Sequence, residues 1–174
     1  HITGAAGLCE VTGARSAMGL ASAAGCADRL LNDGDTVVFG NQVIRTIATP
    51  GHTPGCVTYQ WRDRLFTGDA LLIGGCGRTD FQGGNAGQLY DSITERLFTL
   101  PDETLVYPGH DYRHARVSCI GQEKLANPRF ADKSRADFIE LMGHLNLPKP
   151  TLMDQAVPAN LHCGRLAPLD AQDA

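Results

Sequence analysis

The sequence lacks the features of a membrane-spanning or nucleic-acid-binding protein. None of its apolar runs approaches the ~18–20 residues that cross a bilayer, so we expect no membrane partner. The formal net charge is −4, which provides no basic field for nucleic acid. With 43% hydrophobic and 20% charged residues, the 174-residue chain has the composition of one globular domain over residues 1–174.

The sequence also lacks any CxxC pair among its six cysteines, which argues against a zinc ribbon or a thioredoxin-type motif. Because the chain is long and shows no secretory segment, we expect free thiols in place of disulfides. A reducing compartment follows from this expectation, and we predict a cytoplasmic location.

An initiating methionine is absent, since the chain begins with His1. The apolar start HITGAAGL has no basic region before it, unlike a signal peptide. We therefore expect that His1 follows an N-terminal segment of a longer chain.

β-Branched and aromatic residues predict two hairpins in the first half of the chain. Residues 35–39 and 42–49 flank the turn Gly40-Asn41, and residues 57–61 and 64–68 flank Arg62-Asp63. A strand is also expected at Thr104–Tyr107. The helical spacing of apolar residues predicts four helices, over residues 1–13, 86–100, 118–127 and 132–145.

Two segments show no regular pattern. The stretch 71–87 is rich in glycine, and the tail 146–164 is interrupted by proline, so we expect both to be irregular. Strands and helices in this order indicate a sheet packed against helices, an α/β or α+β sandwich.

Three segments repeat one local design in which a strand ends at a glycine and a polar side chain follows. They are TPGHTPG around His52, FTGDAL around Asp69 and YPGHDY around His110. Two imidazoles and one carboxylate at the rim of a sheet suit a first-row divalent metal. Each turn alone is also typical of an ordinary surface loop, and only their joint occurrence indicates a metal site. His114 and His144 are expected to be surface residues.

PGHTPG, TGDAL and PGHDY, in this order and at these spacings, resemble the metallo-β-lactamase superfamily, and in particular its glyoxalase II branch. In that family an HxHxDH motif precedes a helix, and HITGAAGL resembles the sequence that follows it. The resemblance makes His1 the last histidine of the motif and places the earlier histidines and the aspartate upstream. It implies an αββα sandwich that here lacks its first strands.

A narrower resemblance, to the persulfide dioxygenases, covers nearly the whole chain. It rests on GGCGRTDFQGG, SCIGQEKLANPRF and VPANLHCG. It implies one Fe(II) per chain, bound by His52, Asp69 and a third ligand upstream of His1, with His110 completing the catalytic set. His1 and His110 would bind a second metal in the glyoxalase II branch, and here would hydrogen-bond near the single iron. The implied reaction oxidises glutathione persulfide with O₂ to sulfite and glutathione.

The same resemblance assigns roles to residues around the metal. Arg78 would bind a glutathione carboxylate and Tyr112 would contact glutathione, while Asp111 would fix the loop that carries His110. The alternatives are an Arg78 paired with Asp80 and a Tyr112 at the edge of the core. Cys76 reads as a small buried residue in preference to a thiol near the substrate. A rhodanese partner or fusion and a homodimer are the further partners expected.

Two other functions stay open at this point. One is a glyoxalase II-like thioester hydrolase with two metal ions, zinc among them. The other is an inactive or sensor domain of this fold within a sulfur-handling protein.

Overall fold

The computed structural model describes residues 1–81 and 83–165. The chain packs as two compact units. The smaller contains residues 1–18, residues 23–30 and the C-terminal part from Leu147, and the larger contains residues 19–22 and 31–146. The sequence predicted a single domain over residues 1–174; this stays a prediction, and each unit is described by itself.

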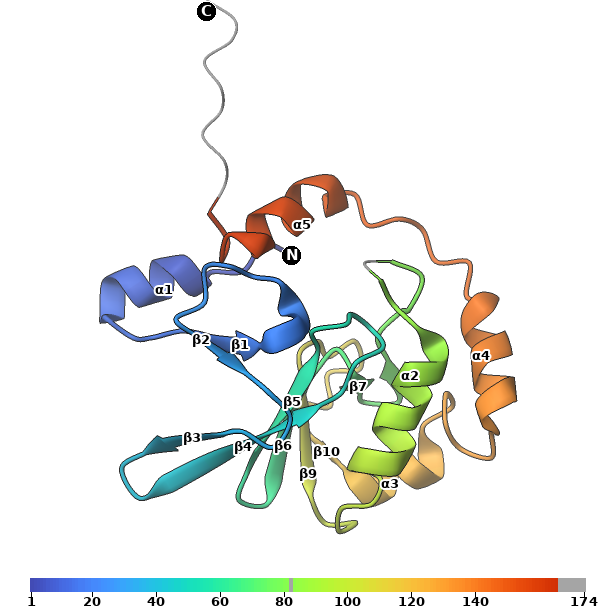
Figure 1. Cartoon of the computed structure of the whole chain (residues 1–174). Coiled ribbons are helices and arrows are strands. Elements are labelled where there is room, and N and C mark those ends of the chain that lie inside the picture. The colour runs from blue at the N-terminus through green and yellow to red at the C-terminus, as the bar shows by residue number, and fades with distance from the viewer. Residues whose placement is uncertain (82, 166–174) are drawn as a thin grey trace, which may run out of the picture. The chain divides into compact units, whose positions relative to one another are not determined.

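A mixed six-stranded sheet is the framework of the larger unit (Figure 1). Both predicted hairpins are confirmed, with two-residue turns at Gly40-Asn41 and Arg62-Asp63. Its strands lie in the order β10 (Ser118–Cys119), β9 (Leu105–Pro108), β6 (Arg64–Gly68), β5 (Val57–Trp61), β4 (Gln42–Ala48) and β3 (Thr36–Phe39). Neighbouring strands are antiparallel, except that β6 and β9 run parallel.

Helices cover one face of this sheet and enclose the core. The predicted helix over residues 86–100 forms α2 (Ala86–Asp91) and continues as a π-helical segment, η2 (Ser92–Leu97). Its apolar stripe of Leu89, Ile93 and Leu97 is fully buried, in one cluster with Leu65 of β6 and Val106 of β9. The other helices are α3 (Ile120–Ala126) and α4 (Arg135–Gly143), and Figure 1 shows α2 and α4 side by side.

The helix α4 begins with Ser134 as its N-cap residue. The Ser134 hydroxyl accepts a hydrogen bond from the Asp137 amide, and the Asp137 carboxylate accepts one from the Ser134 amide. This reciprocal capping box satisfies two amides that the first turn of a helix leaves without partners.

Aromatic side chains line the sheet face opposite the helices. Strand residues alternate between faces, and the register sets Tyr59, Phe66 and Tyr107 side by side across β5, β6 and β9. The rings of Phe66 and Tyr107 stack 5.7 Å apart, yet Phe66 is 40% exposed. The larger unit therefore contains one helical layer and one sheet layer of the expected αββα sandwich.

Part of the glycine-rich stretch is regular, which corrects the expectation of an irregular loop. β7 (Leu71–Leu72) and β8 (Gly75–Cys76) pair as a short antiparallel hairpin. Leu71 and Leu72 are both buried. The prediction was wrong because tertiary packing, which glycine content does not reveal, holds this segment.

The smaller unit contains α1 (Ala5–Thr12), α5 (Met153–Leu161) and most of the strands β1 (Ala17–Gly19) and β2 (Arg29–Leu31). Gly19, Leu31 and the 3₁₀ turn η1 (Leu20–Ser22) lie in the larger unit. As predicted, the first helix ends at Gly13, whose φ of 69° is left-handed. The irregular tail is a wrong prediction, because α5 forms despite Pro158. The Asn160 side chain holds this helix to the N-terminus by accepting from the Thr3 amide at 2.8 Å and donating to the His1 carbonyl at 2.9 Å.

A disulfide between Cys26 and Cys163 corrects the expectation of six free thiols. The two Cα atoms lie 6.0 Å apart although 137 positions separate the residues in sequence. The fold brings them together, so no local spacing signalled the pair. The remaining cysteines are free, at positions 9, 56, 76 and 119. The argument from free thiols to a reducing compartment therefore fails, and the cytoplasmic location stays a prediction.

Among the described residues, no helix combines the length and the apolar character needed to cross a membrane.

The disulfide predicts a redox-dependent stability. It closes a loop of 137 positions, and such cross-links contribute about 2–5 kcal/mol. Cys163→Ser should lower the free energy of unfolding by about this amount in urea denaturation of the oxidised protein. Cys9→Ser, which alters a free cysteine of the same unit, should change it by less than about 0.5 kcal/mol. Equal effects of the two substitutions would show that the disulfide does not stabilise the fold.

Candidate metal centre

Three strands that end at the same edge of the sheet bring the predicted site residues together. β4 and β6 are both antiparallel to β5, and β9 is parallel to β6, so all three run in one direction. Asp69 follows β6 directly, His110 follows β9 after Gly109, and His52 lies in the loop after β4. This topology explains why the three similar sequence segments belong to one site.

Asp69 and His110 are joined by a short hydrogen bond. The His110 Nδ1 atom lies 2.6 Å from Asp69 Oδ1. An ionised carboxylate only accepts hydrogen bonds, so the imidazole donates. The backbones of the two segments are also joined, because the Gly109 amide donates to the Gly68 carbonyl at 2.7 Å. Both side chains are about 30% exposed and can be reached from solvent.

His52 is oriented by a backbone carbonyl. Its Nδ1 lies 2.6 Å from the Arg78 carbonyl oxygen, which can only accept a hydrogen bond. Nδ1 therefore carries the proton, and Nε2 keeps the lone pair that a metal ligand needs. Nε2 lies 3.7 Å from Asp69 Oδ2. Two ligand atoms bound at about 2.0–2.2 Å to one ion are at most about 4.4 Å apart, so this pair fits one coordination sphere.

The described chain supplies only part of a ligand set. Among residues 1–81 and 83–165, no group of three or more His, Cys, Asp or Glu side chains is placed to hold a metal ion. His52 and Asp69 are a pair, and His110 binds the Asp69 carboxylate through Nδ1. His1 belongs to the smaller unit, and its predicted role near the metal stays a prediction.

Arg78 forms the ion pair that the sequence left as an alternative. Its Nε and Nη2 donate to the two carboxylate oxygens of Asp80 at 2.7 Å each, and its guanidinium lies 4.3 Å from the centre of the Phe81 ring. This hydrogen-bonded pair lowers the pKa of Asp80 and raises the pKa of Arg78. Binding of a substrate carboxylate by Arg78 stays a prediction.

The loop after His110 is ordered by its own aspartate. The Asp111 carboxylate accepts from the amides of Arg116 at 2.8 Å and Arg113 at 3.0 Å, and these bonds lower its pKa. The Tyr112 ring lies parallel to the His110 ring, 5.8 Å between centres, and is 77% exposed. Tyr112 is therefore not a core-edge residue, and its contact with a substrate stays a prediction.

Gly77 is a site residue that sequence reasoning missed. Its amide donates to the Asp69 carbonyl at 2.8 Å. A Cβ atom at Gly77 would lie 2.3 Å from that carbonyl oxygen and 2.8 Å from the His52 ring. The available signal was the position of this glycine within GGCGRTDFQGG, between Asp69 and the carbonyl that orients His52.

Cys76 is partly buried and packs against the core, where the sequence reasoning favoured a small buried residue. Its sulfur lies 3.9 Å from the Met142 sulfur, and burial raises the pKa of the thiol to about 12. A thiol with this pKa stays protonated and is a poor nucleophile near neutral pH.

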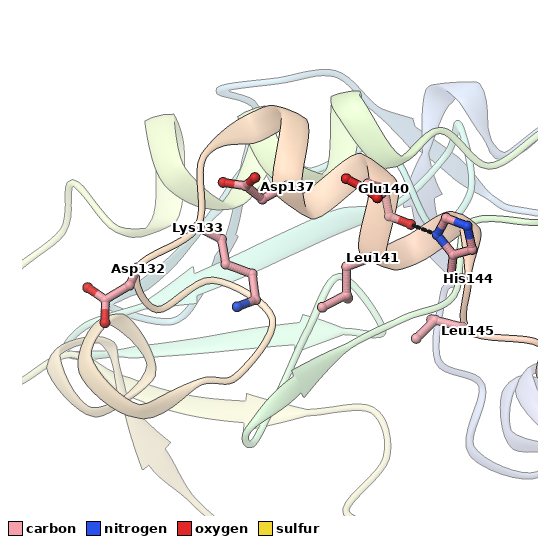
Figure 2. A pocket seen from close by; sticks show the side chains of 7 residues that line it. All are labelled: Asp132, Lys133, Asp137, Glu140, Leu141, His144 and Leu145. Carbon is pink, nitrogen blue, oxygen red and sulfur yellow. Dashed lines mark hydrogen bonds between the residues drawn. The ribbon is translucent and has the colours of Figure 1, made fainter.

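A hollow of about 560 Å³ along α4 is lined by none of the predicted site residues, although the histidine expected at the surface, His144, lies in it (Figure 2). The His144 Nδ1 donates to the Glu140 carbonyl of its own helix at 2.8 Å. The hollow does not belong to the candidate metal centre. Its lining residues are Asp132, Lys133, Asp137, Glu140, Leu141, His144 and Leu145.

Comparison with known proteins gives a consistent result. Residues 1–110 match the Metallo-beta-lactamase superfamily. The human mitochondrial persulfide dioxygenase ETHE1 is 50% identical over 171 residues, which are 97% of this chain and 66% of the human protein. The chain thus spans slightly less than two thirds of that relative.

Solved structures support the same relationship. The crystal structure of ETHE1 from Myxococcus xanthus matches with a TM-score of 0.92 at 55% identity, covering 95% of this chain and 73% of that one. The structure of TTHA1623 in a di-iron-bound form matches with a TM-score of 0.60 at 30% identity, covering 74% of this chain and 71% of that one.

Gly77→Ala should disturb the site because the added methyl group has no space beside His52 and Asp69. We expect a loss of about 1–3 kcal/mol in urea denaturation. We also expect faster solvent exchange of the His52 Nδ1 proton by NMR.

The matched control is Gly75→Ala, two positions away, where the nearest contact of an added Cβ would be an ordinary 4.0 Å. It should leave both measurements nearly unchanged. If the two variants behave alike, the close approach at Gly77 does not constrain the site.

The Cys76 thiol should make stability depend on pH. Below pH 9.0, its ordinary pKa, the thiol is protonated in both states; between there and about pH 12 only the unfolded thiol ionises, which favours unfolding. The free energy of unfolding should fall across this window by up to about 4 kcal/mol. Cys76→Val should show a smaller fall between pH 8 and 10 in urea denaturation. Identical pH profiles for the two proteins would contradict the assignment.

Proposed function

The chain belongs to the metallo-beta-lactamase superfamily, in the group of the ETHE1 persulfide dioxygenases, and on this basis we propose that the full-length protein oxidises glutathione persulfide with dioxygen. The observation that carries the proposal is the geometry of His52 and Asp69. Their Nε2 and Oδ2 atoms lie 3.7 Å apart at the sheet edge.

The proposed cofactor is one Fe(II) per chain. His52 and Asp69 would bind it, together with a third protein ligand from residues that precede His1. Two histidines and one carboxylate on one face of an iron ion leave coordination positions open. Fe(II) would supply the redox chemistry by which dioxygen reacts with a persulfide sulfur, chemistry that Zn²⁺ cannot supply.

Residues of this chain orient the ligands. The Arg78 carbonyl fixes the protonated nitrogen of His52 and thereby presents Nε2 to the metal. His110 holds one oxygen of Asp69 and leaves the other directed toward His52. In this proposal His110 completes the catalytic set without binding the iron. Asp111 keeps the loop after His110 in place.

The substrate would be held by the loops around the metal. Glutathione carries two carboxylates, and Arg78 would contact one of them. Tyr112 would contact glutathione through its exposed ring beside His110. One persulfide, one O₂ and one water give one glutathione thiol, one sulfite dianion and two protons. The sulfur–sulfur bond breaks, and the outer sulfur is oxidised as dioxygen is reduced. The chain's task is therefore to place the terminal sulfur beside the metal.

Persulfide sulfur has to be delivered to such an enzyme. A rhodanese partner or fusion would supply it, because sulfurtransferases form persulfides. As a separate proposal, the protein assembles as a homodimer.

A thioester hydrolase with two metal ions is the second candidate function. It is favoured by the likeness to TTHA1623, whose structure is described as di-iron-bound. Two metal ions would supply an activated water for hydrolysis of the thioester.

Replacement of one ligand tests the proposal. Asp69→Ala in the full-length protein should abolish iron binding and oxygen uptake with glutathione persulfide, with the circular dichroism spectrum unchanged. Asp63→Ala, at the turn between β5 and β6, removes an exposed carboxylate and should leave both intact. Iron content is measured by elemental analysis and oxygen uptake with an electrode.

Other outcomes separate the two candidate functions. One iron per chain and oxygen uptake in the wild-type protein support the dioxygenase. Two zinc ions per chain, with hydrolysis of a glutathione thioester and no oxygen uptake, would overturn it.

A further inference from the structure

Two buried polar side chains lie outside the candidate metal centre and have no part in the proposed function as described so far. Glu123, on α3, is 2% exposed, and Asn127, directly after α3, is 1% exposed. A buried carboxylate needs hydrogen-bond donors to offset its loss of hydration. The partners of these two residues therefore show what they hold.

Their partners are backbone groups of the β7–β8 hairpin. Glu123 Oε2 accepts from the Gly74 amide at 2.9 Å and from the Asn127 side-chain amide at 2.8 Å. Oε1 accepts from the Ser118 hydroxyl at 2.5 Å. The Asn127 amide also donates to the carbonyl of Gly75 at 3.0 Å and reaches that of Leu72 at 3.5 Å. One carboxylate and one amide thus fix the hairpin on both strands and at its turn.

The chain leads directly from this anchored hairpin into the metal centre. The next residue after β8 is Gly77, whose amide donates to the Asp69 carbonyl at 2.8 Å. Arg78 follows, and its carbonyl accepts the His52 Nδ1 proton at 2.6 Å. The hairpin therefore connects one candidate ligand to the group that orients the other.

Gly74 is held from its other side as well. The Arg113 Nη2 atom lies 3.4 Å from the Gly74 carbonyl oxygen. A Cβ atom at Gly74 would lie 2.8 Å from the Arg113 guanidinium carbon, so the arginine packs directly on this glycine. Arg113 belongs to the loop after His110, whose conformation Asp111 fixes. The turn of the hairpin is thus clamped between α3 and the His110 loop.

We infer that Glu123 and Asn127 are positioning residues of the metal centre. They set the hairpin, the hairpin sets the Arg78 carbonyl, and that carbonyl sets the tautomer and direction of the His52 ring. The inference rests on the metal site of the proposed function, but its structural part concerns hydrogen bonds of the metal-free chain. A merely stabilising role would lower the unfolding midpoint and leave the His52 ring as it is.

Glu123→Gln in the full-length protein tests this inference. A glutamine keeps the side-chain size, and its NH₂ group can face the Ser118 hydroxyl, which is able to accept. Its uncharged amide oxygen accepts more weakly than a carboxylate oxygen, so the bond from the Gly74 amide weakens. The first measurement is solvent exchange of the His52 Nδ1 proton, followed by NMR in metal-free protein. The second is affinity for Fe(II) and, separately, for Zn²⁺. We expect exchange to be faster and affinity for both metals to fall by roughly 10–100-fold, as for other partners of metal ligands.

Two controls separate positioning from stability. Leu97→Ala removes a fully buried side chain of η2 and destabilises the same unit without removing a hydrogen bond of the hairpin. It should leave proton exchange and metal affinity unchanged under conditions where the protein is folded. Glu103→Gln makes the same chemical change at an exposed position and should change neither measurement. If Glu123→Gln does not fold, Asn127→Ala should show the same losses, since it removes the bonds to Gly75 and Leu72.

The inference is overturned if Glu123→Gln folds and alters neither exchange nor affinity, or if Leu97→Ala alters both as strongly. Failure of the proposed function has a different signature. Wild-type protein would then show no oxygen uptake with glutathione persulfide, whereas the exchange comparison in metal-free protein would still decide whether Glu123 orients His52.

Discussion

Parallel pairing of β6 with β9 sets Gly68 opposite Pro108, and the geometry of the metal centre follows from this register. The strands end together, so Asp69 and His110 emerge from neighbouring positions at one edge. Their backbones are joined by the bond from the Gly109 amide to the Gly68 carbonyl, and their side chains by the bond from His110 to Asp69. β4 reaches the same edge because two antiparallel steps across β5 restore the strand direction. Sheet topology thus places three segments that are far apart in sequence.

Those features that depend on local chemistry could be predicted from the sequence. Both hairpins were predicted because a two-residue turn separates runs of β-branched and aromatic residues. The stripe of Leu89, Ile93 and Leu97 predicted the buried helix face because its spacing follows the helical repeat. The association of His52, Asp69 and His110 was also visible, since each follows a strand and a glycine.

Features that depend on distant partners were missed. The disulfide joins residues 137 positions apart, and the β7–β8 hairpin is bonded by side chains from α3. The orientation of His52 likewise depends on a backbone carbonyl, that of Arg78, and any residue type can provide a carbonyl. Sequence patterns report side-chain types, so backbone partners of this kind leave no trace in them. Glu123 illustrates the same limit, because a single glutamate in a helix normally indicates a solvated face, whereas here it is buried.

Two glycines of the candidate metal centre, Gly77 and Gly109, acquire a different explanation from the structure. In the sequence, PGH, TGD and GGCG suggest turns, where glycine is chosen for its backbone freedom. At Gly77 and Gly109 the backbone needs no left-handed conformation, and the reason is space. A Cβ atom at Gly77 would meet the Asp69 carbonyl and the His52 ring, and one at Gly109 would lie 3.0 Å from Asp69 Oδ1.

Close approach of this kind has a consequence for the metal ligands. The Asp69 backbone carbonyl and the His52 ring both contact the loop of residues 77–78, so a shift of the loop would disturb both residues. The Gly77 amide donates to the Asp69 carbonyl, and the Arg78 carbonyl accepts from His52 Nδ1. These two hydrogen bonds fix the orientation of Asp69 and His52 relative to the loop. Because Gly77 has no side chain, the loop can approach both candidate ligands this closely, and its hydrogen bonds set the positions of the two residues relative to each other.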